Sequence, residues 1–153
     1  ELKPVKIRWL AEDIKGMLTP SLKKLGIGLK VIVEDATLML EPDLMKTVLL
    51  NLLDNGRKAI EGEGTLYLLG RREEEGFAIY VRDTGKGIPK EELSRITEAF
   101  YMVDKSRARQ QGGAGLGLSI CQEIVKRHGG IMTFKSIQGK GTMVRIFLEA
   151  ELE

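Results

Sequence analysis

The sequence predicts an α/β domain in which three helices cover one face of a mixed β-sheet. Three stretches repeat apolar residues at helical spacing, and about six shorter stretches are typical of strands. The 153 residues are 42% hydrophobic and 30% charged, which suits one compact globular domain. Packing the helices on one side of the sheet would bury both sets of apolar side chains, so we expect a two-layer sandwich over residues 1–153.

The first half of the chain predicts two long helices with two short strands between them. Apolar residues at three- and four-residue steps indicate the first helix, with Pro20 in its last turns and Trp9 as a partly buried anchor. A Glu-Pro-Asp sequence announces the second helix. The expected ranges are 7–26 and 41–60 for the helices, and 27–33 and 37–40 for the strands.

The second half predicts four more strands and a third helix. The third helix ends at a Gly129-Gly130 cap, and Cys121 on it is expected to be a small core residue. Between residues 83 and 117 only a short helical stretch is expected, at about 90–99. A segment of this length without sustained periodicity is usually functional or mobile. The expected ranges are 65–71, 77–82, 131–137 and 142–149 for the strands, and 116–128 for the helix.

Charge and composition exclude several classes of function. Lys and Arg number 24 against 22 Asp and Glu, spread along the chain, so nucleic acid is not an expected partner. No apolar run approaches the roughly 20 residues that span a bilayer, so we expect no membrane contact by this domain. The single Cys excludes an intramolecular disulfide. The chain starts at Glu1 without an initiator Met, and we expect a fragment of a longer protein.

Three polar residues lie along one line of the second helix, at the border between its apolar and polar faces. They are Asn51, Asn55 and Lys58. Two amide oxygens and one ammonium group in such a line could hold a hydrated Mg²⁺ ion and the phosphates attached to it. The alternative is that they are ordinary polar residues at the edge of a core.

Two glycine-rich motifs follow this helix. Ten of the 18 glycines lie between Gly85 and Gly141. In the first motif, residues 83–89, Asp83 directly follows a strand, and its carboxylate suits recognition of an exocyclic amine such as that of adenine. The second motif, residues 112–118, opens the third helix, where unpaired N–H groups favour an anion. It has neither the Lys-Ser/Thr of a Walker loop nor the context of a Rossmann fingerprint.

These motifs together resemble the ATP-binding catalytic domain of bacterial sensor histidine kinases, within the superfamily that includes gyrase, Hsp90 and mismatch-repair ATPases. The resemblance extends from the first helix to Leu148. It implies the Bergerat fold, an α/β sandwich with a flexible lid over ATP. The N, G1, F, G2 and final glycine boxes of that family correspond to residues 51–59, 83–89, 100–101, 113–117 and 139–142.

The resemblance also implies a role for each candidate residue. Asn55 would be the main Mg²⁺ ligand, with Asn51 in support. Lys58 and the lid glycines would hold the phosphates, Asp83 would bind the adenine amine, and Thr142 would assist near the base. The other residues expected to bind the nucleotide are Gly85, Gly87, Ile88, Tyr101, Lys105, Arg107, Gly113, Gly115, Leu116, Gly117 and Leu118.

One position separates a kinase from a hydrolase. ATPases of the superfamily resemble one another in a Glu four residues before the metal-binding Asn, and here that position is Asn51. Because an amide cannot take a proton from water, transfer to an external His is favoured. The only His, His128, lies on the apolar stripe of the third helix and is expected to be structural. The acceptor would then lie on a separate helical hairpin, and a response regulator would act downstream.

The sequence departs from the family pattern at two positions, and other functions stay open. Met102 stands where many members have Arg, although Lys105, Arg107 or Arg109 could replace that charge, and Gly56 stands where Ala is commoner. The alternatives are a Ser-protein kinase or an ATPase of the same fold, and a nucleotide-binding module whose kinase activity has decayed. The expected location is cytoplasmic, and the sequence leaves open whether the parent chain lies in the bacterial inner membrane.

Overall fold

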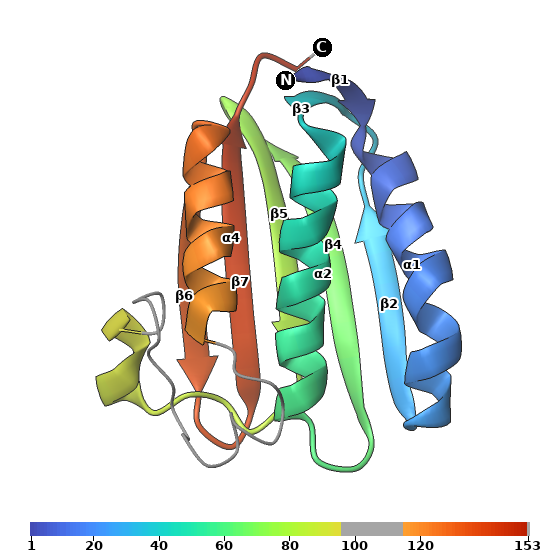
Figure 1. The fold of residues 1–153 in the computed structure, drawn as a ribbon, viewed down its shortest axis with the longest axis vertical. Helices are drawn as coiled ribbons and strands as arrows, with labels where there is room; N and C mark the ends of the chain where they lie inside the picture. Colours follow the sequence, from blue (N-terminus) through green and yellow to red (C-terminus); the bar gives the residue numbers. More distant parts are fainter. Residues whose placement is uncertain (96–114, 153) are drawn as a thin grey trace.

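The computed structural model describes residues 1–95 and 115–152, and it confirms the predicted α/β architecture (Figure 1). The short stretch expected to be helical at 90–99 is a 3₁₀ helix in its described part. In chain order the elements are β1 (Lys3–Lys6), α1 (Ile7–Lys24), β2 (Ile27–Val33), β3 (Thr37–Leu40), α2 (Pro42–Ala59), β4 (Gly64–Glu73), β5 (Gly76–Asp83), η1 (Lys90–Arg95), α4 (Gly115–Arg127), β6 (Ile131–Ile137) and β7 (Gly141–Glu149).

The strands form a five-stranded mixed sheet and a separate two-stranded sheet. In the large sheet the order is β2-β4-β5-β7-β6, with β2 and β4 parallel and all other neighbours antiparallel. The small sheet pairs β1 with β3 in antiparallel register. The sequence did not predict β1, because its four residues, Lys-Pro-Val-Lys, carry one apolar residue suited to a strand and no alternation.

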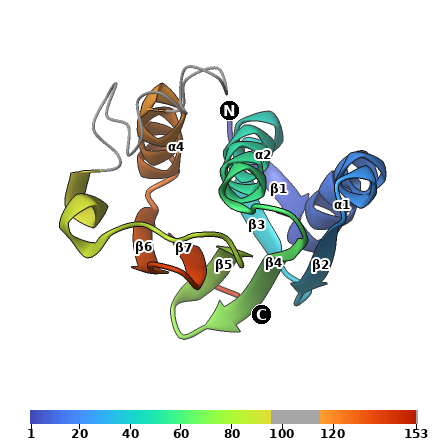
Figure 2. The same ribbon diagram turned by 90° about the horizontal axis from the view of Figure 1, so that it is seen from below.

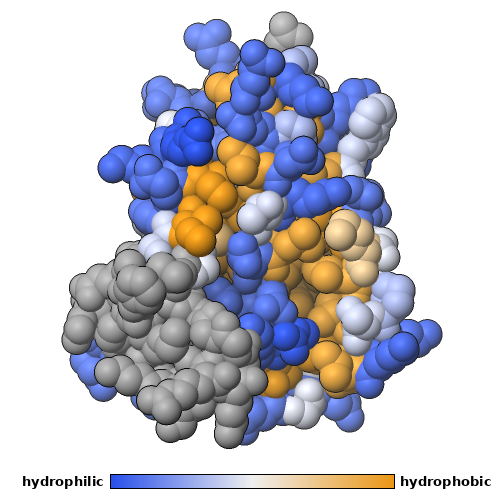
Figure 3. Space-filling model, in the orientation of Figure 1, coloured by the Kyte–Doolittle hydropathy of each residue, from blue (hydrophilic) through white to orange (hydrophobic). Residues whose placement is uncertain are grey.

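The helices α1, α2 and α4 cover one face of the large sheet and leave the other face bare (Figure 2). The core lies between these two layers, where strand residues such as Leu66, Phe77 and Ile146 meet α2 residues such as Met45 and Leu49, all of them buried. Apolar side chains (orange) also reach the surface between α1 and α2 on the helical side (Figure 3). None of the described helices is long and apolar enough to cross a membrane.

Three expectations for the first helix are wrong. Trp9 is 69% exposed. The three- and four-residue steps that predict this helix run through Ile7, Leu10, Ile14, Met17, Leu18, Leu22 and Leu25, but Met17 and Leu25 are 53% and 51% exposed. At 100° per residue, Trp9 falls on the side of α1 opposite to the buried Ile7. The Trp9 ring instead contacts Lys6, whose Nζ lies 4.8 Å from the ring centroid.

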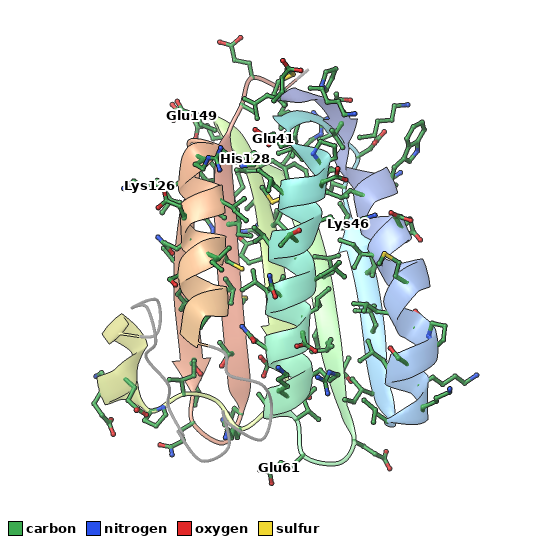
Figure 4. All side chains as sticks on the ribbon, in the orientation of Figure 1. Glu41, Lys46, Glu61, Lys126, His128 and Glu149 are labelled. Atoms are coloured by element: carbon green, nitrogen blue, oxygen red, sulfur yellow. The ribbon has the colours of Figure 1, made fainter. Side chains whose placement is uncertain are left out.

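The central helix α2 is tied to both neighbouring helices. On one side Lys46 forms an ion pair with Asp13 of α1. On the other, His128 points from the end of α4 toward Glu41 at the start of α2 (Figure 4). Its Nε2 accepts a hydrogen bond from the Glu41 N–H (3.1 Å), and its Nδ1 lies 2.9 Å from the carbonyl oxygen of Ile124. His128 therefore has the structural role that the sequence predicted.

The predicted end of the third helix and the buried cysteine are also confirmed. Gly129 has φ +71°, the left-handed conformation of a helix cap, and the N–H of Gly130 reaches the carbonyl of Val125 at 2.9 Å. Cys121 is fully buried against α2, and burial raises the pKa of its thiol to about 11. A thiol in this state is not a nucleophile at neutral pH.

Candidate functional site

A pocket of about 160 Å³ lies where the carboxyl end of α2 meets β5 and β7. The volume is below the 300–1,000 Å³ of complete small-molecule sites, and it suits one ring system rather than a whole nucleotide. The residues that line it are Leu52, Asn55, Gly56, Ala59, Val81, Asp83, Lys86, Gly87, Ile88, Leu118, Phe134, Thr142 and Val144.

Asp83 is the one buried charged residue of the described core, with 8% of its surface exposed. It ends β5 and faces the helical layer, as do Val81 and Ile79 before it. One of its carboxylate oxygens accepts a hydrogen bond from the N–H of Gly85 (2.8 Å). Burial raises the pKa of Asp83, and hydrogen bonds from the backbone N–H groups of Gly85 and Thr142 oppose that rise. The result is a hydrogen-bond acceptor held in a mostly apolar pocket.

The segment after Asp83 is fastened to α2 and to the β6–β7 turn. The N–H of Lys86 donates to the carbonyl of Ala59 at the end of α2 (3.0 Å), and the N–H of Gly139 donates to the carbonyl of Lys86 (2.6 Å). The N–H of Ile88 donates to Ser136 Oγ, 2.7 Å away. One wall of the pocket is thus built from backbone groups whose hydrogen bonds are already made.

Two of the glycines have positions that no other residue could take without displacing the backbone. Gly87 has φ +74°, and a Cβ there would lie 2.3 Å from the carbonyl oxygen of Ile137. Gly141 has φ +140°, and its Cβ would lie 2.1 Å from the carbonyl oxygen of Asp83. These close approaches bring the β6–β7 turn against the Asp83 segment.

Gly56 gives Asp83 room against α2. A Cβ at Gly56 would lie 2.8 Å from Leu66 Cδ2, 3.1 Å from Asp83 Cβ and 3.4 Å from an oxygen of the Asp83 carboxylate. The departure from the commoner Ala is therefore a packing feature of this chain. It lets the carboxylate approach the axis of the helix more closely than a side chain at this position would allow.

The two asparagines and the lysine of α2 do not all face the pocket. Asn55 lines it, and its Nδ2 is buried with no hydrogen-bond partner in the described part of the chain. Asn51 is half-buried one turn earlier and outside the pocket lining. Lys58 Nζ lies 3.2 Å from an oxygen of Asp54, which also binds Arg57. Asn55 thus keeps hydrogen-bonding capacity for a ligand.

Thr142 connects the pocket to the β6–β7 turn. Its hydroxyl lies 2.7 Å from Ser136 Oγ, which also receives the N–H of Ile88. Thr142 pairs with Asp83 across β7 and β5. The predicted base-binding pair thus lies on neighbouring strands in direct register.

The remaining predicted residues divide into three groups. Leu118 of α4 lines the pocket, and Gly117 lies one residue before it without lining it. Gly85 does not line the pocket. A Cβ added at Gly85 would lie 2.7 Å from the carbonyl oxygen of Ala59, so the backbone of Gly85 packs closely against the end of α2. Gly115 and Leu116 begin α4. The expectations for Tyr101, Lys105, Arg107 and Gly113, and for the F box, Met102 and the lid, lie outside the described residues.

Sequence reasoning missed several residues of the pocket wall. Lys86 stands inside the predicted Asp83 motif and was not singled out. Phe134 and Val144 were expected only as strand residues, and their pocket position follows from strand alternation once the register of β6 and β7 is known. Within the described residues no group of three or more His, Cys, Asp or Glu side chains could hold a metal ion.

Comparison with known proteins identifies the family. Residues 40–152 match the family described as histidine kinase-, DNA gyrase B-, and HSP90-like ATPase. The sensor histidine kinase WalK of Bacillus subtilis is 40% identical over 116 residues, which are 74% of this chain and 19% of WalK. The chain spans less than a fifth of the length of the curated relatives it matches.

Solved structures agree on the fold. The catalytic domain of the histidine kinase ThkA superposes with a TM-score of 0.85 at 22% identity, over 97% of each chain. A further structure shows ThkA in complex with the response regulator protein TrrA, with a TM-score of 0.79 at 20% identity over 98% of this chain and 42% of the other. Full-length ShkA in complex with AMPPNP gives 0.83 at 27% identity, over 98% of this chain and 32% of ShkA.

The fold, the matched residues and the sequence motifs agree. The predicted resemblance to histidine-kinase catalytic domains is thereby confirmed, and this chain belongs to the histidine kinase-, DNA gyrase B-, and HSP90-like ATPase family.

Proposed function

We propose that this domain binds Mg²⁺-ATP and positions the γ-phosphate for transfer to a His on a separate domain of a longer kinase. The observation that carries the proposal is the buried Asp83 in a pocket of single-ring size, with Asn55 beside it on α2. Residues 1–153 would act as one domain of that kinase.

Adenine recognition would rest on Asp83 and its neighbours. The exocyclic amine of the base would donate to the Asp83 carboxylate, and the apolar side chains of Leu52, Val81 and Val144 would cover the ring. A charged acceptor in a mostly apolar pocket discriminates strongly, because a base without the amine would leave it unpaired. Thr142 would take a second position at the base edge, held by Ser136.

The metal would sit on the amides of α2. Asn55 and Asn51 are one helical turn apart and share a face, so their oxygens can reach one ion. The unpartnered atom of Asn55 is its donor Nδ2, which would donate to an acceptor of the bound nucleotide and leave Oδ1 for the ion, because a buried donor without a partner is costly unless a ligand satisfies it. Bound Mg²⁺ would neutralise phosphate charge. The proposed part of Lys58 in holding the phosphates would require it to leave Asp54.

An external phosphate acceptor follows from the residues near the metal. Asn51 stands where a hydrolase would place a Glu, and an amide cannot activate water. His128, the only His in the chain, has both ring nitrogens engaged, Nε2 by the Glu41 N–H at the start of α2 and Nδ1 by the Ile124 carbonyl of α4. Catalysis would therefore consist of in-line placement and charge neutralisation, with the acceptor His on a helical hairpin. A response regulator would receive the phosphate next, in a cytoplasmic setting.

Calorimetric titration with a non-hydrolysable ATP analogue, with and without Mg²⁺, tests the site. Asn55→Ala should remove most of the Mg²⁺-dependent gain in affinity and leave metal-free binding nearly unchanged. Thr47→Ala, exposed on the same helix, is the matched control and should bind as the wild type does. If Asn55→Ala kept the full response to Mg²⁺, the metal assignment would be wrong.

Trans-phosphorylation of helical-hairpin substrates tests the reaction. The expected product carries phosphate in an acid-labile, base-stable linkage, which is the behaviour of a phosphohistidine. An acid-stable product would point to Ser instead. Binding of nucleotide without transfer to any hairpin would favour a module that has lost its kinase activity.

A further inference from the structure

The face of the large sheet opposite the helices carries a groove that the nucleotide pocket does not explain. The groove has a volume of about 700 Å³, within the range of binding sites. Its floor is formed by β4, β5 and β7, and its sides by residues of β2 and β6, among them Ile32 and Thr133. None of the described helices lies on this face (Figure 2). Ile32 of β2 is 66% exposed there and gives the groove an apolar side.

Two rows of side chains run across the strands on this face. The strand registers place their members opposite one another. The first, the mixed row, consists of Ile32, Leu69, Tyr80, Arg145 and Thr133, all of which line the groove. The second, the basic row, consists of Lys30, Tyr67, Arg82, Met143 and Lys135.

The three cationic side chains of the basic row form no ion pair with other described residues. Among residues 1–95 and 115–152, Lys30, Arg82 and Lys135 have no salt-bridge partner. The two carboxylates of the groove are already engaged. Glu34 accepts from the N–H of Arg72 at 2.7 Å, and Glu73 lies 2.5 Å from Arg145 and 3.2 Å from Arg71. The face therefore has an excess of positive charge.

Glu73 shows that this face already holds one carboxylate of the chain itself. A single carboxylate is held there by two guanidinium groups and by the hydroxyl of Tyr80, 3.0 Å away. Guanidinium groups bind carboxylates through directed N–H groups, so the same chemistry is available to a ligand at Arg82.

The aromatic rings of this face are covered by cations. Arg82 and Lys30 lie 5.0 and 5.9 Å from the centroid of Tyr67, and Arg71 and Arg145 lie 5.5 and 6.0 Å from that of Tyr80. Proteins that bind single-stranded nucleic acid need open ring faces on which bases stack. The covered rings favour carboxylates over nucleobases as the ligand.

The width of the groove indicates the shape of the partner. The strands β2 and β6 are four strand spacings apart, or roughly 19 Å. An α-helix rises about 1.5 Å per residue, so a helix of roughly 13 residues laid across the strands reaches from β2 to β6. An extended peptide would add to the edge of a sheet and would not need this floor of side chains.

We propose that this open sheet face is a docking site for an acidic amphipathic helix of a partner protein. Apolar side chains of the helix would cover Ile32, Leu69 and Met143, and its carboxylates would pair with Lys30, Arg82 and Lys135. The proposal is independent of the nucleotide site, which lies on the other face of the sheet.

A displayed library of helical peptides tests the site on the 153-residue chain. Peptides of about 16 residues span roughly 24 Å, enough to cross the groove. They would carry a constant apolar stripe and randomised polar positions. Selection should enrich Asp and Glu at the randomised positions, and selected peptides should shift the backbone amide signals of Tyr67, Leu69 and Met143. Enrichment of basic residues, or no enrichment, would overturn the proposal.

Charge reversal of the basic row supplies the second measurement. The triple variant Lys30→Glu, Arg82→Glu, Lys135→Glu should bind selected peptides at least about tenfold more weakly. The matched control, Lys15→Glu, Lys23→Glu, Lys126→Glu, changes the net charge equally on exposed positions of the helical layer and should keep the affinity within about twofold. Thermal unfolding of both variants checks that they are folded.

Two further comparisons separate this site from its alternatives. Asp83→Asn should impair nucleotide binding and leave peptide binding intact, so failure of one proposal is distinguishable from failure of the other. A single-stranded oligonucleotide of similar length should bind more weakly than the selected peptides. If the oligonucleotide bound this face more tightly, or if the two triple variants weakened peptide binding equally, the docking proposal would be wrong.

Discussion

The two faces of the five-stranded sheet are built from the same strands but differ in burial and in charge. On the helical face, alternate residues such as Leu66, Leu68 and Ile79 are buried, and the one charged residue is Asp83 at the nucleotide pocket. On the open face, the intervening positions carry tyrosines and basic residues. On the helical face a charged residue points to a binding site because charged residues are rare there. On the open face charged residues are common, so a charged residue points to a binding site only when it has no ion-pair partner.

The largest expected difference between the faces concerns core packing. Leu68→Ala removes a fully buried side chain and should lower the free energy of unfolding by about 2–5 kcal/mol. Leu69→Ala, the next residue of β4 on the open face, should cost less than about 1.5 kcal/mol because its side chain is half-buried. Urea denaturation of both variants measures the difference. Equal losses would mean that the open face is a second core.

A pair of glycine substitutions compares a crowded helix position with an open one. Gly56→Ala places a methyl group against Leu66 and Asp83 and should destabilise the protein by about 1–3 kcal/mol, and also weaken nucleotide binding. Gly16→Ala on α1 meets nothing within 4 Å and should stabilise it by about 0.5–1 kcal/mol. A gain in stability for Gly56→Ala would contradict the account of Asp83 packing.

The carboxylates of Asp83 on the helical face and Glu73 on the open face should make the free energy of unfolding depend on pH in opposite directions. The pKa of Asp83 is raised by burial, so its contribution is favourable below its ordinary value of 3.8 and is lost as the pH rises through the raised pKa. Burial also acts to raise the pKa of Glu73, but hydrogen bonds from Tyr80, Arg145 and Arg71 outweigh it and lower the value. Its contribution is present above 4.5 and is lost as the pH falls.

Unfolding measured from pH 3 to pH 7 tests this sign difference. Asp83→Asn should gain stability relative to the wild type as the pH rises, and Glu73→Gln should lose it. Each effect should be less than about 1 kcal/mol. Glu73 is partly solvated, and the backbone N–H groups of Gly85 and Thr142 offset the burial of Asp83. Slopes of the same sign for both variants would show that one of the two environments is misassigned.

Periodicity was sufficient to predict most of the fold. Apolar residues at helical or strand spacing predicted each helix and strand of the sandwich that carries a regular apolar pattern. The strand β1 has no such pattern and exists because β3 pairs with it. Trp9 was misjudged because apolar character was read as burial, although its helical angle points away from Ile7.

The candidate site could be predicted in its polar residues and not in its walls. Asn55 and Asp83 carry chemistry that sequence spacing makes visible, Thr142 was implied by the family resemblance, and the structure brings all three to one pocket. Phe134 and Lys86 could not be found, because a pocket wall depends on register and turn geometry that no local pattern encodes. The groove on the open face was missed for the same reason, since its rows exist only across paired strands.

The attachment of α2 on both sides has a consequence for motion within the domain. With Lys46 held by Asp13 and the Glu41 N–H held by His128, this helix cannot shift without breaking contacts to α1 and α4 together. Its amides should then exchange with solvent chiefly through global unfolding and show nearly the full stability of the protein. If the domain rearranges when a ligand binds, segments other than α2 would move, and α2 would keep its position.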